Sequence, residues 1–150
     1  MSVSATLTFT IHKYDVNVTW VDIIKFLLEN GWTVNDCGKM TYLPLSDNNT
    51  FNWQHEEINE KKLFKILEEK EKSKESLGVS ITWLDTNIGG NILTHNENEF
   101  SLIITINRQK IKLYERKTIT DVNWYLLKLN SIMAKRKDVI ITSIKFYELM

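Results

Sequence analysis

The residues that could carry covalent chemistry are few in this chain and lie far apart. It holds one cysteine, Cys37, and three histidines, at positions 12, 55 and 95. A cysteine becomes a nucleophile beside a base or a positive charge, whereas Cys37 follows the acidic Asp36. Zinc sites need three or four ligands at recognisable spacings, and the sequence contains neither Cys-x-x-Cys nor His-x-x-x-His. We therefore expect no metal, no cofactor and no catalytic residue.

Carboxylates are more numerous, and general acid–base catalysis needs two of them on facing walls of a cleft. The candidates come from four separate segments: Asp47, Glu56, Asp85 and Glu97. A small hydrolase-type enzyme that uses these dispersed carboxylates is one alternative. The remaining acidic residues group in segment 56–60 and, together with lysines, in segment 68–75, where opposite charges three and four residues apart are typical of a solvated helix.

Two polar segments are candidates for binding a partner. In residues 52–57, Trp53 lies among hydrogen-bonding and acidic side chains and outside any apolar periodicity, as expected of an interface anchor. In residues 85–90, Asp and Asn offer acceptors, and two glycines permit a positive φ or a close backbone approach. By contrast, Trp20 and Trp83 follow the spacing of core residues. The predicted partner-binding set is Asp47, Trp53, His55, Glu56, Glu57, Asp85, Asn87 and Glu97.

Charge and hydropathy narrow the classes of partner. Nineteen basic and nineteen acidic residues give a net charge of zero, which disfavours nucleic acid, although single-stranded nucleic-acid binding on an aromatic sheet face is a further alternative. No apolar stretch approaches the roughly 18 residues that span a bilayer. The first ten residues alternate polar and apolar side chains, unlike a signal peptide. We therefore expect a cytoplasmic protein without a membrane partner.

The elements that must position these residues can be read from periodicity and capping signals. Thr19 and Asp22 resemble a capping box ahead of the first helix, and Asn30-Gly31 ends it. Pro44 places its strand at or near a sheet edge. The sequence predicts a strand at 5–12, a helix at 20–28, a hairpin of 32–35 with 40–45, a short strand at 51–53, a helix at 56–72, a four-strand meander (79–83, 91–94, 100–107, 110–114), a helix capped by Thr120, and a strand at 139–146.

This order of elements favours one α+β domain over residues 1–150, with a largely antiparallel sheet and three helices packed mainly on one face. At 150 residues such a domain can bury a core without a metal or a disulfide. No linker rich in proline, glycine or serine divides the chain.

The size, neutral charge, α+β build and lack of a catalytic motif together resemble the small immunity proteins that bacteria encode beside polymorphic or contact-dependent growth-inhibition toxins. The segments that carry this resemblance are residues 52–57 and 85–90. It implies a non-catalytic protein that binds and occludes one cognate toxin domain, frequently a nuclease, in a one-to-one complex. Acidic side chains around an aromatic anchor would then imitate the phosphates that the toxin binds. The free protein would be a monomer or a homodimer.

Overall fold

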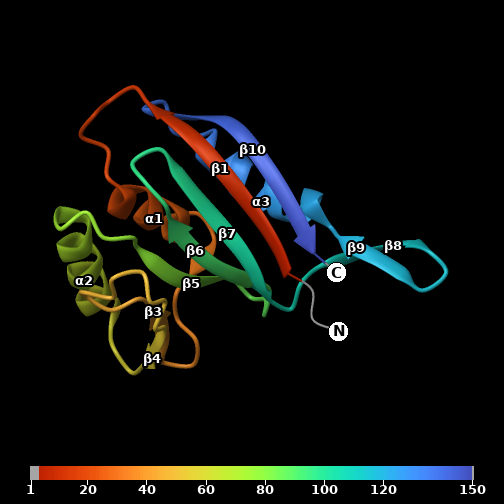
Figure 1. Ribbon diagram of the computed structural model, residues 1–150, viewed down its shortest axis with the longest axis horizontal. Helices are drawn as coiled ribbons and strands as arrows, with labels where there is room; N and C mark the ends of the chain where they lie inside the picture. The colour runs from red at the N-terminus through yellow and green to blue at the C-terminus, as the bar shows by residue number, and fades with distance from the viewer. Residues whose placement is uncertain (1–3, 150) are drawn as a thin grey trace.

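The computed structural model describes residues 4–149, which fold into three helices and ten strands (Figure 1). The elements, in chain order, are β1 (Ser4–Lys13), α1 (Trp20–Glu29), β2 (Trp32–Thr33), β3 (Met40–Tyr42), β4 (Gln54–Glu56), α2 (Glu60–Lys72), β5 (Gly78–Trp83), β6 (Gly89–Thr94), β7 (Glu99–Ile106), β8 (Lys110–Tyr114), β9 (Lys117–Thr120), α3 (Val122–Met133) and β10 (Val139–Leu149).

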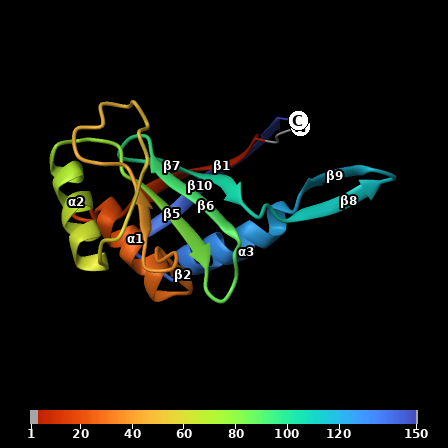
Figure 2. The same cartoon turned by 90° about the horizontal axis from the view of Figure 1, so that it is seen from below.

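Eight of the strands form one antiparallel sheet in the order β10-β1-β7-β6-β5-β3-β4, and β2 pairs separately with β5. The helices gather on one face of this sheet (Figure 2). The predicted α+β class, with a mostly antiparallel sheet, is therefore confirmed. The strand β1 lies inside the sheet, between β7 and β10, although it comes first in the chain.

The first helix forms where the capping signals predict it. The Thr19 side chain accepts the backbone N–H of Asp22, and the Asp22 carboxylate accepts that of Thr19. A second carboxylate, from Glu71 of α2, accepts the N–H groups of Trp20 and Val21 at 2.7 and 3.1 Å. These donors have no partner within the helix, so Glu71 both satisfies them and joins α1 to α2.

The core lies between the helices and one face of the sheet. Along β1 the buried residues alternate with partly exposed threonines, so that Leu7 and Phe9 face the helices. The ring of Phe9 stacks on Phe100 of β7 with centroids 4.9 Å apart, and Trp20 meets Phe100 edge-on. This packing excludes water from the helix-covered face.

A smaller apolar cluster lies on the opposite face of the sheet. Strand alternation places Gly78, Leu43 and Leu93 there, because their neighbours Val79, Tyr42 and Ile92 belong to the main core. A side chain at Gly78 would clash with Leu43 at 2.6 Å and with the Trp53 ring at 2.8 Å. Glycine at position 78 therefore lets Leu43 and the indole of Trp53 pack directly on the sheet.

The predicted hairpin of 32–35 with 40–45 is wrong. The short strands β2 and β3 both pair with β5, at Trp83 and Val79 respectively, and an isolated bridge joins Asp36 to Lys39. The expected strand at 51–53 is displaced to β4, and α2 begins at Glu60, because the Asn59 side chain caps it. Propensity did not distinguish these alternatives, since tertiary pairing decides them.

The predicted four-strand meander is correct for β5, β6 and β7 but not for β8. Instead of continuing the sheet, β8 pairs with the unpredicted β9 in a separate hairpin that projects from the body (Figure 1). The third helix is capped by Asp121 and not by Thr120. The glycine pair makes the close backbone approach expected of it, because a Cβ at Gly89 would lie 1.9 Å from the carbonyl oxygen of Ile81.

Candidate partner-binding site

The segment between β3 and β4 forms a built loop, residues 43–53, which we call the Asp47 loop. Its centre is the Asp47 carboxylate, which is buried and accepts three hydrogen bonds, one each from Thr50, Phe51 and Asn52. The backbone N–H groups of Phe51 and Asn52 donate at 2.9 Å each, and the Thr50 hydroxyl donates at 3.0 Å. The charge of Asp47 is thus used inside the loop.

These contacts shift the titration of Asp47. The N–H of Asn52 lowers the pKa of its carboxyl below the ordinary value, against the effect of burial, and the N–H of Phe51, the Thr50 hydroxyl and the charge of Lys70 act in the same direction as Asn52. Hydrogen bonds to the ionised form favour that form. The carboxylate is therefore charged at neutral pH and holds the loop through its charge.

The backbone of the Asp47 loop is strained. Four of its residues have a positive φ and none of them is glycine: Ser46, Asn48, Asn49 and Phe51. Asparagine adopts this left-handed region more readily than other residues, whereas a bulky residue such as Phe51, at φ 55°, is a true outlier. Such strain persists where the surroundings over-determine the conformation, and it clusters at functional sites.

The loop is attached to α2 by a buried lysine. The Lys70 side chain is 1% exposed, and its ammonium donates to the Pro44 carbonyl oxygen at 2.6 Å and to the Glu75 carboxylate at 3.2 Å. The same Glu75 carboxylate accepts the N–H of Ser46 at 2.7 Å. Buried charges need partners of this kind, so Lys70 and Glu75 fix the start of the loop on the helix.

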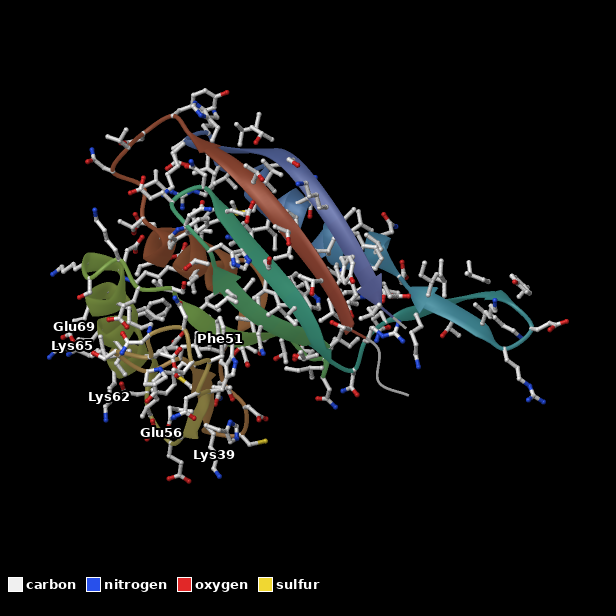
Figure 3. All side chains as sticks on the ribbon, in the orientation of Figure 1. Lys39, Phe51, Glu56, Lys62, Lys65 and Glu69 are labelled. Carbon is white, nitrogen blue, oxygen red and sulfur yellow. The ribbon has the colours of Figure 1, made fainter. Side chains whose placement is uncertain are left out.

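The result of this construction is an exposed aromatic ring. Phe51 is 48% exposed, whereas Trp53, two residues later, is half-buried against Leu43 and Gly78. Figure 3 labels Phe51 and Glu56 at the same end of the molecule as Lys62, Lys65 and Glu69 of α2. The loop therefore presents Phe51 to solvent and uses Trp53 as its support.

The strand β4 continues this surface. His55 and Glu56 are exposed on it, and Glu57 follows. The His55 ring lies between the Thr41 hydroxyl, 2.6 Å from Nδ1, and the Asp36 carboxylate, 3.8 Å from Nε2. The hydroxyl of Tyr42 donates to Glu56, and burial, with the hydrogen bond and the charge of Glu56, raises the pKa of Tyr42 to about 12.

The other predicted site residues lie elsewhere. Asp85 and Asn87 are exposed in the turn between β5 and β6, and Glu97 is exposed in the turn between β6 and β7. These two turns are at opposite ends of β6, so the structure does not bring Asp85 and Glu97 together. Asp47 is buried in its own loop and is not among the residues that line the cavity beside Glu97.

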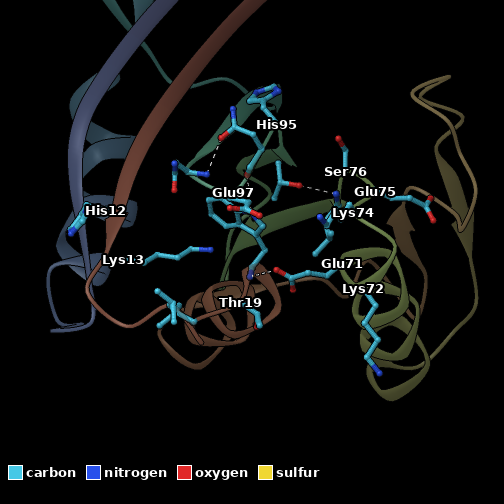
Figure 4. Close-up of a pocket in the computed structure, with 17 residues that line it drawn as sticks. His12, Lys13, Thr19, Glu71, Lys72, Lys74, Glu75, Ser76, His95 and Glu97 are labelled. Carbon is cyan, nitrogen blue, oxygen red and sulfur yellow. Dashed lines mark hydrogen bonds between the residues drawn. The ribbon is translucent and has the colours of Figure 1, made fainter.

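A cavity of about 750 Å³ lies between the β6–β7 turn, the β1–α1 connection and the end of α2 (Figure 4). Its lining includes His12, Lys13, Glu71, His95 and Glu97. Several of these groups already have structural partners: Glu71 caps α1, and the ammonium of Lys13 lies 5.1 Å from the centre of the Trp20 ring. The cavity supplies Glu97 alone of the four candidate carboxylates.

Beside this cavity, His95 makes the contact that most resembles a nucleophile and its base. Its Nε2 lies 2.7 Å from the Ser101 hydroxyl, which is also 2.8 Å from the hydroxyl of Thr8. Ser101 is only 2% exposed. A nucleophile must reach its substrate, so we interpret these three side chains as a hydrogen-bonded link across the open face of the sheet.

Sequence reasoning found residues 52–57 but missed Phe51 and Lys70. The signal for the loop was present in Asp47-Asn48-Asn49, because aspartate and asparagine tolerate the left-handed region. No pattern in the sequence indicated that Lys70, within a polar run of α2, points inward.

Among residues 4–149, no group of three histidine, cysteine, aspartate or glutamate side chains is arranged to hold a metal ion. Within the same residues, no helix has the length and apolar character needed to cross a membrane. No family model, no curated protein and no solved structure matches the chain.

Proposed function

We propose that this protein is a non-catalytic binding protein whose contact surface is centred on the Asp47 loop. The observation that carries the proposal is the exposed ring of Phe51, held at a positive φ by the buried Asp47 carboxylate. A loop that merely joined β3 to β4 would gain nothing from an exposed phenylalanine in a strained conformation. An aromatic side chain on a backbone that is already fixed binds a partner at a lower cost in conformational entropy than one on a flexible loop.

The finer proposal is an immunity protein that neutralises a cognate toxin by one-to-one binding and occlusion. Phe51 would fill a pocket of the toxin domain, and the exposed carboxylates of Glu56 and Glu57 would meet a positively charged surface such as a nuclease presents to phosphate. A cytoplasmic location is part of this proposal. The proposed partner is a protein, and neither nucleic acid nor a membrane takes part in the contact.

The test is capture of the partner from the source organism, followed by native mass spectrometry of the complex. We expect one protein at one-to-one stoichiometry, encoded beside this gene and containing a variable C-terminal domain. Co-expression with that domain should restore growth, and the Phe51→Ala variant should restore it less well. Leu84→Ala is the matched control, because Leu84 is 55% exposed and lies in the turn after β5. Equal restoration of growth by Phe51→Ala, Leu84→Ala and the wild type would contradict the proposal.

A further inference from the structure

The two edges of the sheet differ in length and protection. The edge strand β4 has three residues, whereas β10 at the other edge has eleven. Within residues 4–149, β10 pairs with β1 on one side and with no strand on the other. Proteins ordinarily blunt an exposed edge with charges, proline, a bulge or a short strand. In β10 these devices amount to one register irregularity, at Thr142 opposite Thr10 and Ile11 of β1, and one exposed charged side chain, Lys145.

The exposed side chains of β10 are largely apolar. Ile140 is 46% exposed, Ile144 40%, Tyr147 61% and Leu149 59%. Ile140 and Tyr147 lie on the open face of the sheet, beside His12 and Thr6, whereas Ile144 lies beside Phe9 on the helix-covered face. A long edge with apolar side chains on both faces is suited to pairing with another strand.

The β8–β9 hairpin projects beyond the C-terminal end of β10 (Figure 1). It is attached there because the Glu148 carboxylate accepts the N–H of Thr120 at 3.0 Å and lies 3.6 Å from the Arg108 guanidinium. In the hairpin, Ile111 pairs with Ile119, and Leu113 is the unpaired residue at a register shift between Lys112 and Tyr114. Ile111 and Leu113 are 47% and 54% exposed. An isolated two-stranded hairpin is marginally stable in water, so a partner that covers these exposed apolar side chains would stabilise it.

We propose that a second copy of this chain covers both elements, in a dimer formed by antiparallel pairing of the two β10 strands about a twofold axis. Such an interface is self-complementary, because each strand offers the other the same free N–H and C=O groups. The C-terminal end of each β10 then lies beside the N-terminal end of the other. The hairpin of one copy therefore reaches the turn after β1 of the other copy, which lies beside the start of β10.

That segment carries the exposed apolar residues that the hairpin needs. Tyr14 and Val16 are 66% and 90% exposed, and the N–H of Tyr14 donates to the carbonyl oxygen of Asp138, immediately before β10. In the dimer, the exposed Ile111 and Leu113 of the hairpin contact Tyr14 and Val16 of the second copy. One arrangement thus accounts for the free edge, the uncovered hairpin and this exposed turn.

Charge supports the same occupant. Residues 108–117 contain five of the nineteen basic residues of the chain and one of its nineteen acidic residues, which leaves the rest of the chain with a net charge of −4. The turn that would receive the hairpin includes the exposed Asp15. Stable interfaces bury about 800 Å² per partner, close to a tenth of the 8980 Å² surface of this chain, so strand pairing and hairpin contact would both contribute.

The first test is the mass of the purified protein by sedimentation velocity over a concentration series. The proposal predicts about 35 kDa, twice the 17.7 kDa of one chain. It also predicts that Tyr147→Lys raises the dimer dissociation constant at least tenfold, whereas Leu84→Lys, at a similarly exposed apolar position far from β10, leaves it unchanged. A mass of 17.7 kDa at every concentration would overturn the proposal, and so would equal dissociation constants for the two variants.

The second test uses cysteines and does not depend on how a lysine variant folds. In a Cys37→Ser background, a cysteine at position 142, 143 or 145, near the middle of β10, meets its own copy across the twofold axis. At least one of the three should form a rapid intermolecular disulfide. The wild type is the control, since its exposed Cys37 lies in the turn before β3. Cross-linking no faster than that of the wild type in all three variants would refute the pairing of β10 with β10.

Discussion

The Asp47 carboxylate accepts the backbone N–H of Phe51 at 2.9 Å, and the ring of Phe51 is nevertheless 48% exposed. A buried anion therefore fixes the backbone of a residue whose own side chain is half exposed to solvent. This relationship separates the support of the loop from the surface that the loop presents, and it means that the two can be disrupted independently.

Replacing Asp47 by asparagine should lower the free energy of unfolding at neutral pH and change its dependence on pH. The pKa of Asp47 is lowered in the folded state, so its contribution is present above the unfolded pKa of about 3.9 and is lost as pH falls through the folded pKa. The Asp47→Asn variant should therefore lose less stability than the wild type on acidification. Denaturant titrations at a series of acidic pH values measure this, and parallel curves for both proteins would show that the charge of Asp47 does not hold the loop.

The Phe51→Gly variant should be more stable than the Phe51→Ala variant. Alanine retains the cost of a left-handed backbone, about 1 kcal/mol, whereas glycine adopts φ 55° without it. We expect the free energy of unfolding of Phe51→Gly to exceed that of Phe51→Ala by about 1 kcal/mol, in spite of the greater flexibility of glycine in the unfolded chain. A more stable alanine variant would mean that residue 51 is not held at a positive φ in solution.

Lys70→Ala should destabilise the protein by about 3 kcal/mol, because it leaves the Glu75 carboxylate and the Pro44 carbonyl oxygen without their buried donor. Lys72→Ala is the matched control from the same helix, since Lys72 is exposed. Its effect should stay within about 0.5 kcal/mol. Thermal or denaturant unfolding distinguishes the two, and equal losses of stability would argue against a buried Lys70.

The burial of Tyr42, together with its hydrogen bond to Glu56, predicts a loss of stability in alkali. The pKa of Tyr42 is about 12 in the folded state, whereas an unperturbed tyrosine titrates near 10. Its contribution is therefore fully present below pH 10 and is lost as pH rises through the folded pKa of about 12. Burial also raises the pKa of Tyr125, so tyrosinate absorbance of the folded protein should show a late-ionising fraction from both residues, and Tyr42→Phe should reduce it by one tyrosine. An unchanged titration would place that proton on another tyrosine.

Much of the fold could be predicted from local signals. The capping box at Thr19 and Asp22, the alternation along β1 and the glycine pair at 89–90 each encode their structure within a few residues. Long-range pairing could not be predicted in this way. Nothing local indicates that β2 and β3 both join β5, or that β8 leaves the meander to pair with β9, because the partners lie on other segments.

The candidate site was predictable in place but not in detail. Residues 52–57 were identified from Trp53 and its acidic neighbours, and the Asp47 loop that contains Trp53 leads into β4. An isolated tryptophan in a polar segment could equally pack or protrude. The sequence holds no sign of the space above Gly78 that receives the Trp53 ring, nor of the inward turn of Lys70, and these two contacts decide that Phe51 is the exposed aromatic residue.

The most direct test of a binding surface centred on Phe51 is the dissociation constant of the captured partner for wild type, Phe51→Ala and Leu84→Ala. We expect Phe51→Ala to weaken binding by about 30-fold, as the loss of an interface anchor worth 2 kcal/mol would, while Leu84→Ala binds like the wild type. The free energy of unfolding of both variants should lie within about 0.5 kcal/mol of the wild-type value. Equal affinity of Phe51→Ala and wild type for a one-to-one partner would contradict the account.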